Sequence, residues 1–232
     1  MITLVLLGGN IVLEKQYDSI IFDFDGTLFQ TEKLAVPSFE KTFQQLKEEG
    51  YPLTEWPTEQ QMLSVIGMTL DQIWNELLPE LPREAHLKAN QYMLQNELDG
   101  VKEGYGALYP GVVETLMELK NKGYRLFVAS NGLKEYIHGV SEAFRIEHYF
   151  DAMYAADEYE TESKKDLIKK LVEDHSIMNG IMVGDRHSDV EAGLVNELLV
   201  IGCNFGFATE DELDGAHLII QKFPQLMEVL NF

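Results

Sequence analysis

The chain is short of cysteine and of positive charge, and each shortage limits what the protein can be. Cys203 is the only cysteine among 232 residues, so no disulfide can form within the chain, and we expect a reducing, cytoplasmic setting. Lys and Arg number 18 against 39 Asp and Glu, and this formal charge of -21 disfavours nucleic acid and membrane surfaces as partners. An anionic substrate would need local positive charge from a lysine, a bound cation or helix N-termini.

Long hydrophobic runs are also scarce. The stretch MITLVLLGGNIVLEKQ, residues 1–16, lacks the basic start and the cleavage site of a signal peptide, and it is too short to span a bilayer. Gly8-Gly9-Asn10 divides it into two apolar runs, which predicts either a hairpin or a mobile extension. The hydrophobic content of 45% is enough for a sizeable core, so we expect a globular fold.

Strand-like and helix-like patterns alternate along most of the chain. The predicted strands are residues 19–24, 125–130, 180–183 and 198–201, with weaker ones near Met153 and Leu218. Apolar residues at helical spacing precede the second and third strands: Val112, Leu116 and Leu119, then Leu167, Ile168, Leu171 and Val172. This alternation predicts an α/β fold with a parallel sheet and helices on its faces, a Rossmann-like core.

Residues 31–105 carry helical patterns only. The apolar positions that repeat at helical spacing are Leu34, Phe39, Phe43 and Leu46, then Leu70, Ile73, Trp74 and Leu77. The glycine-containing stretch at residues 100–106 is expected to return the chain to the sheet. We therefore predict a discontinuous α/β core, residues 1–29 and 106–232, interrupted by a helical domain at residues 30–105.

Two aspartates end the first predicted core strand, in the sequence IIFDFDGTLFQT. Side chains at i and i+2 of a strand point the same way, so Asp23 and Asp25 can face one spot at the carboxyl edge of the sheet, where ligands bind in open α/β folds. Gly26 permits a sharp turn there. The alternative is a purely structural turn that ends the strand, but two close carboxylates are best explained by a metal ion between them.

Three further motifs follow in order. Ser130-Asn131-Gly132 ends the second strand, Lys164 begins a helix, and IMVGDRHSD ends another strand with Asp185 and Asp189. Taken alone, the first reads as a simple turn and the lysine as a solvated side chain. Their joint position at strand ends or a helix start favours a common site.

The adjacent lysines at the start of that helix differ in helical phase. Lys164 is i-4 to Ile168 and i-7 to Leu171, on the apolar face, whereas Lys165 lies roughly 90° from the middle of that face. We therefore predict that Lys164, not Lys165, points into the site. The alternative is that Lys164 also extends into water.

The segment DFDGTLFQ resembles the first motif, DxDGT, of the haloacid dehalogenase-like hydrolase superfamily. The three later motifs match the second to fourth motifs of that family, and the resemblance covers nearly the whole chain after about Ser19. The helical insertion resembles a C1-type cap, and PGVVETLMELKNKGYRLFVASNG and GDRHSDVEAG resemble phosphoglycolate-phosphatase-like members. The chain departs from many relatives at Gln30, which stands where the cap hinge begins.

This resemblance implies a Mg²⁺-dependent phosphatase that hydrolyses a small phosphate monoester through an aspartyl phosphate. It implies that Asp23 is the nucleophile and Asp25 the general acid and base. The metal would be held by Asp23, the backbone carbonyl of Asp25 and Asp185, with Asp189 orienting these ligands. The phosphate would be bound by Ser130, Asn131 and Lys164. The expected partner is a small phosphorylated metabolite, with the chain a monomer or weak homodimer.

Two other functions stay open at this point. A β-phosphoglucomutase-like phosphomutase also keeps an acid at the position of Asp25, but the basic cap signature expected of it after Gly67 is absent. A non-catalytic phosphate-binding module would have favoured loss of Asp23, Asp25 or Asp185, and all three are present. The substrate itself is not defined by the motifs.

Overall fold

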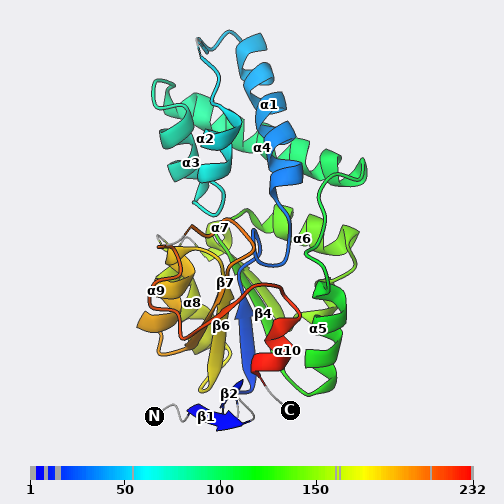
Figure 1. Ribbon diagram of the computed structural model, residues 1–232. Coiled ribbons are helices and arrows are strands. Elements are labelled where there is room, and N and C mark those ends of the chain that lie inside the picture. Colours follow the sequence, from blue (N-terminus) through cyan, green and yellow to red (C-terminus); the bar gives the residue numbers. More distant parts are fainter. Residues whose placement is uncertain are drawn as a thin grey trace.

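The computed structural model describes residues 4–7, 10–13, 17–53, 55–159, 161, 163–209 and 211–230. Within these residues its centre is a six-stranded parallel sheet in the order β5-β4-β3-β6-β7-β8 (Figure 1). The strands are β3 (Ser19–Phe22), β4 (Arg125–Ser130), β5 (Ala152–Ala155), β6 (Gly180–Gly184), β7 (Leu199–Cys203) and β8 (Leu218–Ile220). The predicted α/β fold, including its two weaker strands, is confirmed.

Strand β3 lies in the interior of the sheet, and its alternating side chains fill two separate hydrophobic cores. Ile20 and Phe22 face one core, whereas Ile21 faces the other, as the two-residue period of a strand requires. The first core is covered by α5 (Val112–Asn121), α6 (Lys134–Ala143) and α10 (Gln225–Val229), and the second by α8 (Lys164–Asp174) and α9 (His187–Val195). Two short helices, Glu147–Tyr149 and α7 (Ala156–Tyr159), flank β5. Helices therefore cover both faces of β3.

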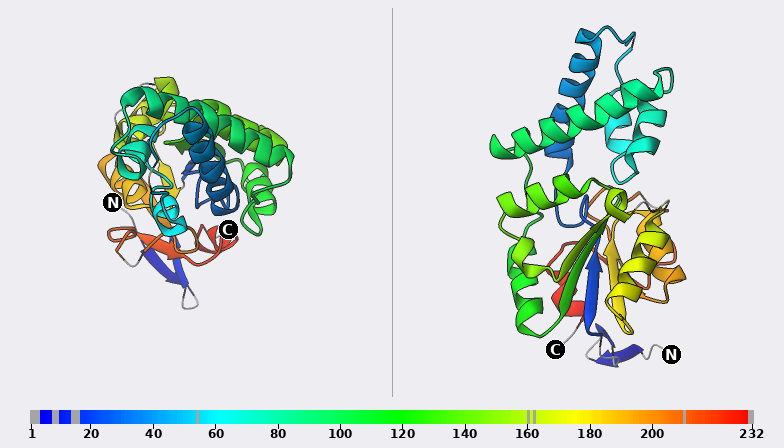
Figure 2. Two further views of the ribbon diagram at one scale, coloured as in Figure 1. Left: turned by 90° about the horizontal axis from the view of Figure 1, so that it is seen from above. Right: turned by 180° about the vertical axis from the view of Figure 1, so that it is seen from behind.

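Four helices stand together beyond one end of the sheet (Figures 1 and 2). They are α1 (Glu32–Glu48), α2 (Glu59–Ser64), α3 (Leu70–Leu77) and α4 (Arg83–Lys102). Their apolar faces form a third core, in which fully buried Trp74 packs edge-on against Phe39 with ring centroids 5.8 Å apart. We call α1 to α4 the helical module.

The end of the helical module differs from its sequence-based description. Helix α4 continues to Lys102, so the return stretch predicted at residues 100–106 is wrong in its first three residues. Gly100 lies inside the helix, where a Cβ atom would come within 2.6 Å of Leu34 Cδ1. Gly100 therefore permits close packing of α4 against Leu34 of α1 and does not form a turn.

The N-terminal segment forms a hairpin. Strands β1 (Leu4–Leu7) and β2 (Asn10–Leu13) pair antiparallel, in agreement with the hairpin alternative, and the two glycines between them lie outside the described residues. The hairpin lies at the opposite end of the sheet from the helical module (Figure 1). Among the described residues, no helix has the length and apolar character needed to cross a membrane.

Candidate active site

Asp23 and Asp25 follow β3 at the end of the sheet that faces the helical module. Both side chains are buried, and the Asp23 backbone N–H donates to the Val183 carbonyl oxygen at 2.9 Å, extending the β3–β6 pairing. Gly26 then turns the chain with a φ of +80°, in the left-handed region. A Cβ atom there would lie 2.3 Å from Asp185 Oδ2, so only glycine permits the turn and the carboxylate together.

Lys164 lies where the helical-phase prediction put it. It is buried at the first position of α8, where its Nζ contacts Asp23 Oδ1 and lies 3.1 Å from Asp189 Oδ1. Lys165 instead pairs with Glu191 at 3.0 Å on the surface. The predicted burial of one lysine and exposure of the other is confirmed.

Asp185 and Asp189 are fixed by hydrogen bonds from neighbouring backbone and side chains. Asp185 Oδ2 accepts from the Phe207 N–H at 2.7 Å, and Asp185 Oδ1 accepts from the Thr27 hydroxyl at 3.2 Å. Asp189 Oδ2 accepts from the Arg186 N–H at 3.0 Å at the start of α9. Both carboxylates are therefore held in place without using their full acceptor capacity.

Three of these carboxylates form a cluster that could hold a metal ion. Asp23, Asp185 and Asp189 each offer an oxygen, and these oxygens lie within 4.8 Å of one another. The Asp25 side chain is not part of the cluster, which leaves its predicted backbone-carbonyl contact to the metal as a prediction. Asp189, predicted to orient the ligands, is close enough to be a ligand itself.

The electrostatics of the cluster fit a divalent cation. Burial, followed by the charge of Asp189, raises the pKa of Asp23 to about 7 despite the opposing effect of Lys164. Burial and the charges of Asp23 and Asp189 raise the pKa of Asp185 well above its usual range. Burial alone would lower the pKa of Lys164, but Asp189 and Asp23 outweigh it and raise that pKa. The cluster thus holds three carboxylates, two of which contact the one ammonium, and their hard oxygens suit Mg²⁺ or a similar ion.

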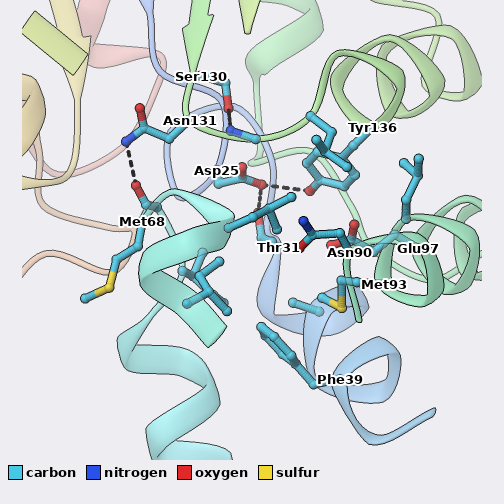
Figure 3. A pocket seen from close by; sticks show the side chains of 18 of the residues that line it. Asp25, Thr31, Phe39, Met68, Asn90, Met93, Glu97, Ser130, Asn131 and Tyr136 are labelled. Atoms are coloured by element: carbon cyan, nitrogen blue, oxygen red, sulfur yellow. Dashed lines mark hydrogen bonds between the residues drawn. The ribbon is translucent and has the colours of Figure 1, made fainter. Parts of the chain in front are cut away.

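The motif after β4 contributes a loop above Asp25 (Figure 3). The buried Ser130 hydroxyl accepts from the Gly132 N–H at 3.0 Å, which leaves its proton free to bond a ligand. Asn131 Nδ2 donates to the Gly67 carbonyl oxygen at 2.9 Å. Asn131 therefore joins the sheet edge to the helical module in addition to lining the site.

Two residues absent from the sequence-based site hold Asp25. The Thr31 and Tyr136 hydroxyls both donate to Asp25 Oδ1, at 2.5 and 2.7 Å (Figure 3). Burial raises the pKa of Asp25, and these two hydrogen bonds oppose the rise. A tyrosine on the apolar face of α6, next to Ile137, was the available signal, because a buried tyrosine hydroxyl usually has a partner.

Arg186, inside the fourth motif, makes a second connection to the helical module. Its Nη2 donates to the Ser64 carbonyl oxygen at 3.0 Å and its Nη1 to the Phe207 carbonyl oxygen at 3.1 Å. Nη1 also lies 3.3 Å from Glu212 Oε1. Its charge is thus already engaged at the edge of the site.

The four motifs of the sequence thus meet at one edge of the sheet, and comparison with known proteins identifies the family. The family model described as haloacid dehalogenase-like hydrolase matches residues 20–202. The chain belongs to this family.

The relatives of this haloacid dehalogenase-like hydrolase include named phosphatases. It is 29% identical over 179 residues to a phosphoglycolate phosphatase of Aquifex aeolicus, covering 75% of this chain and 78% of the relative. It is 26% identical to the pyrophosphatase PpaX of Listeria monocytogenes, covering 92% and 96%. A predicted phosphatase from Clostridium acetobutylicum superposes with a TM-score of 0.77 at 26% identity, covering 91% and 97%.

Proposed function

We propose that the protein is a Mg²⁺-dependent phosphatase that hydrolyses a small phosphorylated metabolite through an aspartyl phosphate on Asp23. The observation that carries the proposal is the contact of buried Lys164 with Asp23 beside two further carboxylates, Asp185 and Asp189. Asp25 stands two residues after Asp23 with its carboxyl oriented by two hydroxyls. Family membership and the phosphatase names of the relatives support the same chemistry.

In the first half-reaction, a carboxylate oxygen of Asp23 attacks the phosphorus atom. A new O–P bond forms while the bond from phosphorus to the leaving oxygen breaks, and Asp25 gives its proton to that oxygen. Burial raises the pKa of Asp25, which favours the protonated form that an acid requires. The Ser130 hydroxyl and the Lys164 ammonium stabilise charge on the transferring oxygens.

In the second half-reaction, water attacks the phosphorus of the aspartyl phosphate. Asp25, now ionised, takes a proton from that water, the bond between phosphorus and the Asp23 oxygen breaks, and inorganic phosphate leaves. Asp23 is regenerated as a carboxylate. The same oriented side chain therefore serves as acid and then as base.

Mg²⁺ would be held by the side chains of Asp23, Asp185 and Asp189, together with the backbone carbonyl of Asp25. When bound, it neutralises charge on the phosphoryl oxygens and on the carboxylates that crowd the site. Asp189 is added to the predicted ligands because its oxygen lies within the same cluster.

The helical module serves in this proposal as the cap, residues 30–105, on a core of residues 1–29 and 106–232. A cap that covers the site excludes water and restricts access to small substrates. The proposed molecule is a cytoplasmic monomer or weak homodimer without nucleic-acid or membrane partners. These features rest on the single cysteine, the negative charge and the family resemblance.

A phosphate-release assay tests the proposed function. Purified protein should hydrolyse 4-nitrophenyl phosphate with Mg²⁺ and not with excess chelator. Asp23→Asn should lower kcat/KM by on the order of a thousandfold, because an amide is a poor nucleophile. Asp71→Asn, an exposed change of the same kind in α3, is the matched control. Release of no phosphate by the wild type would favour the non-catalytic binding module instead.

A further inference from the structure

A pocket between the helical module and the sheet edge begins at Asp23 and Asp25 and is lined mainly by apolar side chains of the module. The apolar lining from α1 to α4 and the loops between them is Ala35, Phe39, Ile66, Met68, Leu70, Ile73, Met93 and Leu94. Figure 3 shows Phe39 and Met93 beside this space, with Asp25 and Ser130 at its far side. The group attached to a phosphate at Asp23 would extend into this pocket.

Helix α4 adds two polar side chains to the apolar wall. Asn90, Met93 and Glu97 lie three and four residues apart, so they share one face of the helix, and all three line the pocket. Asn90 Oδ1 accepts from Trp74 Nε1, which orients the amide and leaves its Nδ2 as a donor. The Glu97 side chain is half-buried in the pocket lining, and no hydrogen bond or ion pair joins its carboxyl to another residue that the structure describes.

The pocket has negative groups and no positive one. Among the residues that the structure describes, its lining includes Asp23, Asp25 and Glu97 but no lysine, arginine or histidine. Lys164 contacts Asp23, on the phosphate side of the site. The guanidinium of Arg186, whose side chain lies beside Gly67, is engaged by Glu212 and by backbone carbonyls.

This distribution of charge discriminates among leaving groups. A second anionic group would be buried beside Asp25 and Glu97 without a counter-ion, which is unfavourable. Burial and the charge of Asp25 raise the pKa of Glu97 well above its usual range; a bound ammonium would oppose this rise, whereas a second anion would strengthen it. A hydroxyl or an ammonium group would instead supply the hydrogen-bond donor that the Glu97 carboxyl lacks.

We infer that the substrate is a phosphate monoester of a mainly apolar alcohol whose leaving group donates a hydrogen bond to Glu97 and carries no second anionic group. The inference rests on the proposed phosphatase function and narrows its substrate class. It predicts that substrates with a second anionic group, such as 2-phosphoglycolate and pyrophosphate, are poor substrates of this protein. Glu97 is the specificity-determining residue, and Met93 and Phe39 supply apolar contact.

The test is a series of alkyl phosphates of two to four carbons that end in a hydroxyl, an ammonium or a carboxylate group. At the best chain length, the carboxylate ester should have a kcat/KM at least about tenfold below the hydroxyl and ammonium esters. Glu97→Gln should reduce the preference for ammonium over carboxylate by about tenfold or more, because an amide of the same shape cannot form the ion pair that a carboxylate forms with an ammonium. Glu84→Gln, an exposed change at the start of α4, should leave that preference unaltered.

Failure of the substrate inference can be distinguished from failure of the proposed phosphatase function. Fastest hydrolysis of the carboxylate esters, or an unchanged preference in folded Glu97→Gln protein, would overturn the substrate inference while leaving the phosphatase function standing. Release of no phosphate from any ester, or from 4-nitrophenyl phosphate, would overturn the proposed function and this inference with it. The wild-type series decides the question even if Glu97→Gln fails to fold.

Discussion

Among the residues that the structure describes, Lys164 is the one positive side chain that contacts Asp23, and it lies 141 positions further along the chain. Its partner Asp189 lies 3.1 Å away, so the ammonium joins two carboxylates that would otherwise repel. A buried charge with two opposite partners is costly to remove, because both partners are then left uncompensated. The lysine therefore supports the site as well as a bound phosphate.

Replacing Lys164 and Lys165 one at a time distinguishes a lysine that acts in the site from a lysine that is only a surface charge. Lys164→Ala should lower kcat/KM by the equivalent of about 2 to 4 kcal/mol, because it removes the phosphate contact and the balance of charge. Lys165→Ala removes only a surface pair with Glu191 and should have almost no effect. Steady-state kinetics of both variants make the comparison, and an equal or larger loss at Lys165 would contradict the assignment.

Tyr136 provides a second test at the residue scale. Tyr136→Phe removes one of two donors to Asp25 Oδ1. Loss of a hydrogen bond to a charged group lowers the free energy of unfolding by about 1.5 to 3 kcal/mol. Because that bond favours the carboxylate, its loss should raise the pKa of Asp25 and move the alkaline limb of the kcat/KM profile to higher pH. A lower rate with an unmoved profile would show that Tyr136 has only a structural role.

The sequence predicts Asp23, Lys164 and Ser130 at the site, but it does not predict the two hydroxyls that hold Asp25. Asp23 and Lys164 could be predicted because strand alternation and helical phase fix where their side chains point. Thr31 and Tyr136 could not, since their role depends on which loop and helix pack against Asp25 in three dimensions. Glu97 was missed for the same reason.

At the scale of elements, Gln30 joins the two chain segments that lead into and out of the helical module. Its N–H donates to the Ala107 carbonyl oxygen at 2.7 Å, and its Nε2 donates to the Leu108 carbonyl oxygen at 2.8 Å. Lys33 Nζ lies 2.6 Å from Gln30 Oε1. Gln30 thus holds the two linkers together.

Removing the Gln30 side chain should therefore affect binding and turnover together. Gln30→Ala loses the bond to Leu108, worth about 0.5 to 1.5 kcal/mol, and should change KM and kcat by severalfold, as hinge changes do. Lys33→Ala removes only the exposed contact to Gln30 and is the matched control. If both variants behave like the wild type, the linker bond does not influence the cap.

Helix α4 shows why one long element was not predicted. Its buried positions include Ala85, Ala89, Asn96 and Gly100, which are small or polar, so the hydrophobic repeat that marks a helix is weak. In α1 the buried positions include Phe39 and Phe43, whose helical spacing predicts a helix from the sequence. The missed helix carries Asn90 and Glu97, so the pocket could not be predicted either.

At the scale of the whole molecule, the charge of -21 makes stability sensitive to pH and to cations. The ordinary pKa of 3.8 for Asp23 is raised to about 7 in the folded protein. The folded state therefore binds more protons than the unfolded chain between these values, and this contribution to stability falls as pH rises from about 4 to about 7. Asp185 contributes in the same direction.

Mg²⁺ should restore that stability at the pH where it was lost. At 100 times Kd it should add about 2.7 kcal/mol to the free energy of unfolding, a rise in Tm of roughly 5 to 10 °C. At a fixed Mg²⁺ concentration the rise should be larger at pH 8 than at pH 5, where protons compete for the carboxylates and raise Kd. Thermal scans with Mg²⁺ or chelator measure it, with Asp185→Asn expected to show little effect of the metal. An equal rise in that variant would locate the metal elsewhere.

The most direct test of the account is to trap the phosphoryl group on Asp23. An Asp25→Asn variant lacks the base for the second half-reaction, while 4-nitrophenolate leaves without needing an acid, so the aspartyl phosphate should accumulate. We predict a burst of nitrophenolate close to one per enzyme molecule, and mass spectrometry of the acid-quenched protein should find one phosphoryl group on the peptide that contains Asp23. Continued turnover with no phosphoryl group on that peptide would contradict the proposed aspartyl phosphate on Asp23.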